Sequence, residues 1–248
     1  MSEPAAAGPS SFFRDLGDVF FSPGQAFARI ARHRRFLAPM LVTAALGVLF
    51  TGVWLAKADL HEFMRAQVED SAFADRFRDM PAEQQAETLD SQVRVTRVTA
   101  WLGPLVFGPA AIVFAAAVFL FVFRFFHGAE LEAKQSVAVV AWTFLAYSLV
   151  STPLALLVFA LKGDWNLHPG QVLQANLGGL LDKAATPRPL LALAESVDLF
   201  TAWMMALLSI GYGAAIERPA SSAAWGVVGV WLAVVVLKVG LAGLAALF

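Results

Sequence analysis

The sequence ends in two long hydrophobic runs, residues 190–217 and 221–248, which are joined by a short polar turn at residues 217–219. Each run is at least as long as the roughly 20 apolar residues that a helix needs to cross a bilayer. Hydrophobic residues make up 58% of the chain and charged residues only 15%, a balance typical of integral membrane proteins. We therefore expect the two runs to form an antiparallel hairpin of membrane helices.

This hairpin carries charged residues: Glu195 and Asp198 in the first run, and Lys238 in the second. An ionised group in hydrocarbon is costly unless it is paired or hydrated. Asp198 and Lys238 lie equally far from the turn, roughly 28 Å at about 1.5 Å per residue, so we predict an ion pair between them. One lysine cannot neutralise two carboxylates, so Glu195 must reach water or hold a proton.

The three charged residues allow three interpretations. They form a structural pair, a functional polar site within the membrane, or groups that extend to the headgroups and only mark the edge of the bilayer. Spacing along the two helices does not decide whether the side chains of Asp198 and Lys238 face each other.

Three more hydrophobic runs precede the hairpin and predict the remaining spans, at residues 36–56, 101–123 and 135–161. The predicted fold is therefore an all-α integral membrane protein with five transmembrane helices. Residues 57–100 combine helical apolar patterns with many charges, which predicts a helical insertion outside the bilayer. Residues 162–189 have turn formers at both ends and predict an exposed loop.

Residues 1–35 predict a loose tail, without a signal peptide, followed by two short amphipathic helices at the membrane interface. Ser22 and Pro23 are typical of the N-cap and first position of the second helix. Four basic residues surround that helix: Arg29, Arg32, Arg34 and Arg35. They bind anionic lipid on the cytoplasmic leaflet, or they only set the topology; both interpretations remain open.

The basic cluster directly precedes the first span, which predicts a cytoplasmic N-terminus because charge beside the first span usually dominates orientation. Five spans then place Phe248 on the outer side of the cell inner (cytoplasmic) membrane. The chain has no cysteine, which excludes disulfides and thiolate chemistry.

Several short motifs occur in a specific order along about 200 of the 248 residues. They are Ser22-Pro23-Gly24-Gln25-Ala26-Phe27 with Ile30 and Pro39, Gly128 before the third span, and Asp198-Leu199-Phe200-Thr201-Ala202-Trp203 followed by Gly211 and Lys238. In these residues the chain resembles the Ypt-interacting-protein (Yip) domain membrane proteins in their bacterial form. The resemblance implies five membrane helices, a cytoplasmic N-terminus and no catalytic activity.

The eukaryotic members of that family are associated with Rab-type GTPases and vesicle membranes. This chain departs from the family pattern in its large insertion at residues 57–100 and in lacking a long acidic N-terminal tail. Both departures argue against a GTPase partner for this chain.

Motifs for catalysis are missing from the sequence: it has no HExxH, no phosphate-binding glycine loop and no GxSxG. We therefore expect no enzyme, no catalytic residue, no metal, no cofactor and no nucleic-acid partner. The expected partners are membrane lipids, anionic ones among them, and a second copy or other membrane proteins. Two functions remain: a membrane-organising scaffold, or a transporter or lipid-moving protein that uses Glu195, Asp198 and Lys238.

Overall fold

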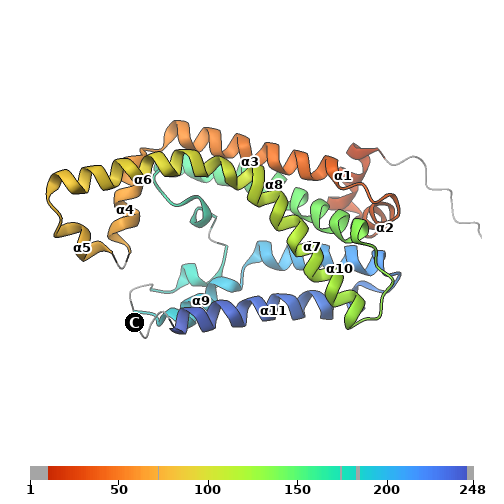
Figure 1. Cartoon of the computed structure of the whole chain (residues 1–248). Helices are drawn as coiled ribbons and strands as arrows, with labels where there is room; N and C mark the ends of the chain where they lie inside the picture. Colours follow the sequence, from red (N-terminus) through yellow and green to blue (C-terminus); the bar gives the residue numbers. More distant parts are fainter. Residues whose placement is uncertain (1–10, 72, 174, 183–184, 245–248) are drawn as a thin grey trace, which may run out of the picture. The chain divides into compact units, whose positions relative to one another are not determined.

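The computed structural model describes residues 11–71, 73–173, 175–182 and 185–244. Within these residues every regular element is a helix (Figure 1). Their one β-type contact is an isolated antiparallel bridge between Asn176 and Asp198. The predicted all-α class is confirmed.

The chain divides into two compact units, which are described separately. Unit 1 comprises Met1–Val42, Ala110–Tyr147 and Gln174–Phe248, and unit 2 comprises Thr43–Pro109 and Ser148–Leu173. Three helices contribute residues to both units: α3 (Leu37–Lys57), α7 (Gly108–Phe125) and α8 (Ala133–Lys162).

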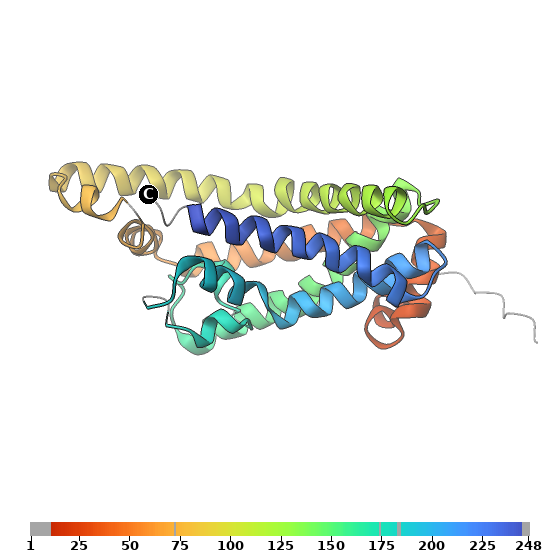
Figure 2. The same ribbon diagram turned by 90° about the horizontal axis from the view of Figure 1, so that it is seen from below.

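Unit 1 contains a C-terminal hairpin formed by α10 (Leu199–Ala215) and α11 (Ala220–Leu244), which lie side by side in both views (Figures 1 and 2). The chain reverses after Glu217, whose φ of 54° is left-handed. Gly213 allows the turn to approach closely, because an added Cβ would lie 2.9 Å from the carbonyl oxygen of Arg218. The polar turn therefore joins two antiparallel helices, as expected.

Unit 1 also contains an N-terminal hairpin formed by α1 (Phe12–Phe21) and α2 (Pro23–His33). The side chain of Ser11 caps α1 by accepting the Arg14 N–H at 3.2 Å. Pro23 occupies the first position of α2, where its missing N–H has no helical acceptor to lose. The two predicted short helices are present.

Unit 2 has an apolar core of its own, formed by the insertion and the adjoining helices. It contains α4 (Leu60–Glu69), α5 (Ala74–Arg78) and α6 (Ala82–Leu102). Phe63 of α4 packs edge-on against Trp54 of α3 at 5.2 Å, and the Trp54 indole N–H donates to the carbonyl of Trp165 at 3.0 Å. The insertion is thus folded onto the end of α3.

The boundary predicted between the insertion and the second span, at residue 100, falls inside a continuous helical stretch. Helix α6 continues through a π-helical segment, Gly103–Phe107, into α7 (Gly108–Phe125). Pro104 lacks the N–H that an α-helix would use, and a wider turn accommodates it, with the Gly108 N–H donating to the Gly103 carbonyl. The glycine-proline pair changes the helical register without ending the helix.

The helix expected over residues 190–217 is not continuous. Helix α9 (Arg188–Ser196) ends before Val197, and α10 begins after Asp198. The backbone of residues 197–199 pairs instead with residues 175–177, through Leu177 N–H to the Val197 carbonyl and Leu199 N–H to the Ala175 carbonyl, both at 3.1 Å. These backbone groups cannot also belong to a helix.

Four helical stretches in the described residues are long and apolar enough to cross a membrane: 37–57, 82–125, 133–162 and 220–244. Helix α10 is apolar but has only 17 residues. That corresponds to about 25 Å, slightly less than the roughly 30 Å of a hydrocarbon core. Five spans remain a prediction.

Candidate functional site

The N-terminal hairpin is closed by a buried charge network. Arg29 of α2 donates from Nε to Asp15 of α1 at 2.8 Å, and its Nη2 pairs with Asp18. The side chains of Arg29 and Asp15 are only 7% and 8% exposed. Burial lowers the pKa of Arg29, but the hydrogen bonds and charges of the two aspartates outweigh this and raise it. The guanidinium therefore stays charged.

Arg29 is consequently not a lipid-surface residue, and that part of the sequence prediction is corrected. It lies on the same face of α2 as Ala26 and Ile30, which are buried. A basic residue on an apolar helix face, following two aspartates spaced three residues apart on the preceding helix, is the sequence signal that would have indicated an internal pair.

The N-terminal hairpin docks on α8 and α10 through Phe27. This side chain is fully buried. Gly211 of α10 makes room for it, since a Cβ there would lie 3.0 Å from the Phe27 ring and 2.5 Å from Val139 of α8. Two residues of the Yip-like motifs, 184 positions apart by their numbers, thus form one contact.

Aromatic contacts extend this docking along α1. The Phe12 ring lies 5.2 Å from Trp142 of α8, and the Phe20 ring lies 6.0 Å from Trp203 of α10. The indole N–H of Trp142 donates to the Arg35 carbonyl at 2.9 Å, where α2 leads into α3. The hairpin is therefore attached at both of its helices.

The remaining motif residues are structural in the same unit. Phe200 packs edge-on against Tyr147 at 6.0 Å. Gly128 has a left-handed φ of 58° in the connection between α7 and α8, a conformation that favours glycine. Ser22 ends α1 by donating its backbone N–H to the Asp18 carbonyl at 2.7 Å.

The outer surface of the N-terminal hairpin is aromatic and basic. Phe13 and Phe21 of α1 are 81% and 88% exposed. Arg32, Arg34 and Arg35 are exposed as expected, and Arg34 pairs with Glu132 at 2.7 Å. Apolar rings beside cationic side chains are the combination found on helices that lie in a membrane interface.

The charged group of the C-terminal hairpin is paired differently from the prediction. Lys238 contacts Glu195 of α9, with Nζ to Oε2 at 3.3 Å, and not Asp198. Both side chains are partly exposed, 45% and 36%. Because α9 is a separate helix, it packs along the end of α11 and brings Glu195, rather than Asp198, to the lysine.

Asp198 instead caps α10: its carboxylate accepts the Thr201 N–H at 2.9 Å. This is the usual role of an aspartate in extended conformation immediately before a helix. An aspartate inside a hydrophobic run, directly before helix-forming residues, is the sequence signal that would have indicated this cap. The three charged residues therefore divide into one ion pair and one cap.

Taken together, the four described helical stretches that are long and apolar enough to cross a membrane, with the amphipathic hairpin docked on them, define the class of polytopic α-helical membrane proteins. A comparison with family models matches the Yip1 domain over residues 17–241. The chain belongs to the Yip1 domain family. No curated protein and no solved structure matches it.

Proposed function

We propose that this protein is a non-enzymatic scaffold that organises or shapes the membrane in which it lies, with the N-terminal hairpin as a fixed wedge. The proposal places it in the cell inner membrane with a cytoplasmic N-terminus and five spans. Helix α10, extended by α9, supplies the fourth span, and α11 supplies the fifth.

The observation that carries the proposal is the exposure of Phe13 and Phe21 on a hairpin that cannot swing freely. With 3.6 residues per turn, Phe13, Phe20 and Phe21 fall within an arc of about 100° on α1. The opposite face holds Asp15 and is tied to Arg29. Burying each ring in lipid contributes about 1.5–3 kcal/mol, so the wedge stays inserted.

The fixed attachment of the N-terminal hairpin allows it to shape the membrane. A free amphipathic helix follows the bilayer, whereas a helix docked by Phe27 against Gly211 forces the surrounding leaflet to adapt to it. Arg32 of α2, which is exposed, adds attraction to anionic headgroups, about 1 kcal/mol per basic residue.

An apolar groove between α7 and α11 supports self-assembly as part of this role. It measures about 670 Å³ and is lined by Gly229 and Ala233 beside Trp225, which is 79% exposed. Small residues on a lipid-facing helix let a second helix approach closely. A second copy or another membrane protein is the expected occupant.

The transporter alternative has less support. Transporter sites lie near the bilayer midplane, whereas Lys238 lies in the last two turns of α11 and its pair with Glu195 is partly exposed. The carboxylate of Asp198 is already used to cap α10. The break before α10 is the one feature that favours transport, since discontinuous helices are common in transporters.

The wedge is tested by reconstituting the purified protein in vesicles of mixed zwitterionic and anionic lipid and measuring vesicle diameter by electron cryo-microscopy. The wild type should shift the population toward smaller vesicles and tubules. Phe13→Ser combined with Phe21→Ser should remove at least half of that shift, because the inserted apolar surface is lost.

Gly17→Ser is the matched control. It adds the same hydroxyl to the same face of α1, and a Cβ at Gly17 meets nothing within 4 Å. It should leave vesicle shape unchanged. A double serine variant that inserts normally and still produces small vesicles would refute the wedge.

A further inference from the structure

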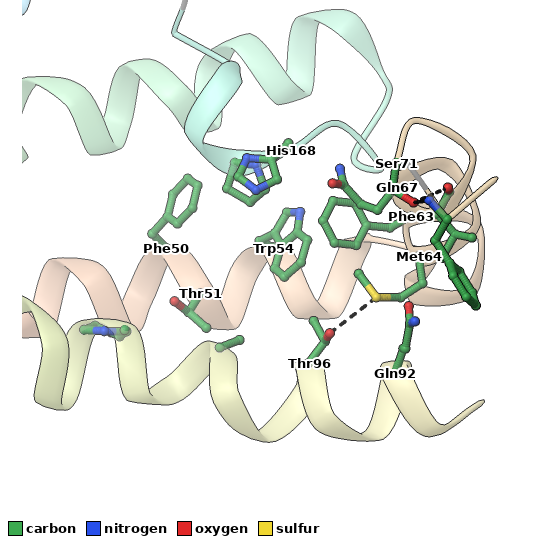
Figure 3. A pocket seen from close by; sticks show the side chains of 16 residues that line it. Phe50, Thr51, Trp54, Phe63, Met64, Gln67, Ser71, Gln92, Thr96 and His168 are labelled. Carbon is green, nitrogen blue, oxygen red and sulfur yellow. Dashed lines mark hydrogen bonds between the residues drawn. The ribbon is translucent and has the colours of Figure 1, made fainter. Parts of the chain in front are cut away.

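Unit 2 contains a pocket of about 690 Å³ that the scaffold role does not use (Figure 3). It lies among α3, α4 and α6 and beside the segment that holds His168. This volume is within the range of roughly 300–1,000 Å³ that small-molecule sites occupy. The insertion at residues 57–100, where this chain departs from the Yip-like pattern, supplies much of its wall.

One end of the pocket is apolar. Phe50 and Trp54 of α3 face it, and Gly103 and Pro104 of the π-helical segment complete this end. A Cβ added at Gly103 would meet nothing within 4 Å apart from its own helix, so the space beside the helix is open. These residues belong to stretches apolar enough to cross a membrane, so this end suits a hydrocarbon chain.

The wall formed by α4 and α6 adds uncharged polar side chains among apolar ones. Gln67 of α4 and Gln92 of α6 line it (Figure 3), and neither carboxamide makes a hydrogen bond within the described residues. His168, which lies beside Trp54 in Figure 3, accepts the Gly170 N–H on Nδ1 at 3.1 Å, so a neutral ring keeps its proton on Nε2 as a donor. These three side chains offer donors and acceptors to a ligand.

The charge around the pocket selects the ligand class further. The described residues that line it include neither Lys or Arg nor Asp or Glu. The insertion carries nine acidic and six basic residues, a net of −3. An anionic headgroup would find no cation in the pocket and an acidic surface around it.

We propose that this pocket binds one lipid-type amphiphile with an uncharged, hydrogen-bonding head, the chain beside Phe50 and Pro104 and the head at Gln67 and Gln92. The proposal does not depend on the wedge, because Phe13 and Phe21 lie in unit 1. The pocket's chemistry matches a neutral acylglycerol better than a phospholipid or a pure hydrocarbon.

The test uses the full chain in detergent-free nanodiscs and a monoacylglycerol with a photoreactive diazirine in its acyl chain. Cross-linked peptides are mapped by mass spectrometry. We expect labels to concentrate on α3 near Trp54 and on α6 near Ala100. Unlabelled monoolein should compete at least tenfold better than either a lysophosphatidylglycerol of the same chain length or hexadecane.

Ala100→Trp fills the pocket and should abolish this label, whereas Val98→Trp, on the same helix but 67% exposed and outside the pocket, should not. Gln67→Leu with Gln92→Leu keeps the volume and removes the head contacts, so the advantage of monoolein over hexadecane should fall at least fivefold. This second variant decides the question if the tryptophan variant fails to fold.

Labels spread evenly over the spans, or unaffected by both pocket variants, would overturn the proposal. Stronger competition by the anionic lipid would also overturn it. None of these outcomes alters the vesicle-shape result. The pocket proposal and the wedge proposal can therefore be refuted independently of each other.

Discussion

At the scale of single residues, Arg29 determines whether the N-terminal hairpin stays closed. Its guanidinium satisfies two aspartates, of which Asp15 is almost inaccessible to solvent and Asp18 is 30% exposed. Removing one partner of a buried pair leaves the other charge uncompensated, which typically costs 3–5 kcal/mol. The hairpin should therefore be sensitive to this residue far more than to the exposed arginines around it.

We predict that Arg29→Met lowers the free energy of unfolding by about 3 kcal/mol, measured by thermal or denaturant unfolding of the purified protein. Arg32→Met is the matched control, because Arg32 lies on the same helix and is exposed. It should change stability by less than about 0.5 kcal/mol. If the two variants had the same free energy of unfolding, the buried network would not stabilise the fold.

Gly211 gives a second residue-scale prediction. In a helix interior, Gly→Ala is normally stabilising by roughly 0.5–1 kcal/mol. Here the new methyl would collide with Val139 and press on Phe27, so Gly211→Ala should destabilise the protein and make α2 more accessible to protease. Gly229→Ala, where nothing lies within 4 Å, should be neutral or stabilising. The same sign for both variants would contradict the docking.

At the scale of elements, the break between α9 and α10 separates the roles of neighbouring charges. Asp198 begins a helix, whereas Glu195, on the preceding helix, meets Lys238. Gly178 fixes this arrangement, because an added Cβ would lie 2.5 Å from the side chain of Glu195. The loop before α9 is thus packed against the ion pair.

We predict that Asp198→Ala costs about 1 kcal/mol of stability and that Asp198→Ser restores most of it, because serine also caps a helix. Lys238→Met should cost less than about 1 kcal/mol, as expected for a partly exposed pair. Denaturant unfolding measures both. If Asp198→Ser were as damaging as Asp198→Ala, the carboxylate would have a role beyond the cap.

At the scale of the whole molecule, the five-span topology predicts which loops share a side of the membrane. The chain has no cysteine, so each introduced thiol is the sole target for a membrane-impermeant maleimide. Arg32→Cys and Ser221→Cys should be labelled from the cytoplasmic side, and Glu83→Cys from the outer side.

Ser221 is the diagnostic position. If α10 does not cross the membrane, the turn between α10 and α11 lies on the side opposite to Arg32. Labelling of Ser221→Cys only from the outer side would therefore reduce the spans to four, with α10 as an embedded helix.

Much of the secondary structure follows from the sequence alone. Hydrophobic length and helical spacing are local properties, so the predicted spans at residues 36–56, 135–161 and 221–248 coincide with α3, α8 and α11 within a few residues over the part of the chain that is described. The polar turn and Pro23 likewise mark helix ends, because capping chemistry acts within one turn.

Tertiary structure decided the partners. Whether Arg29 faces lipid or Asp15, and whether Lys238 meets Asp198 or Glu195, depends on how the helices rotate and break when they pack. Gln67 and Gln92 likewise line one pocket only when the insertion folds. Spacing along a helix determines how far a charged residue lies from the end of that helix. Side-chain packing between helices determines what the charged group contacts.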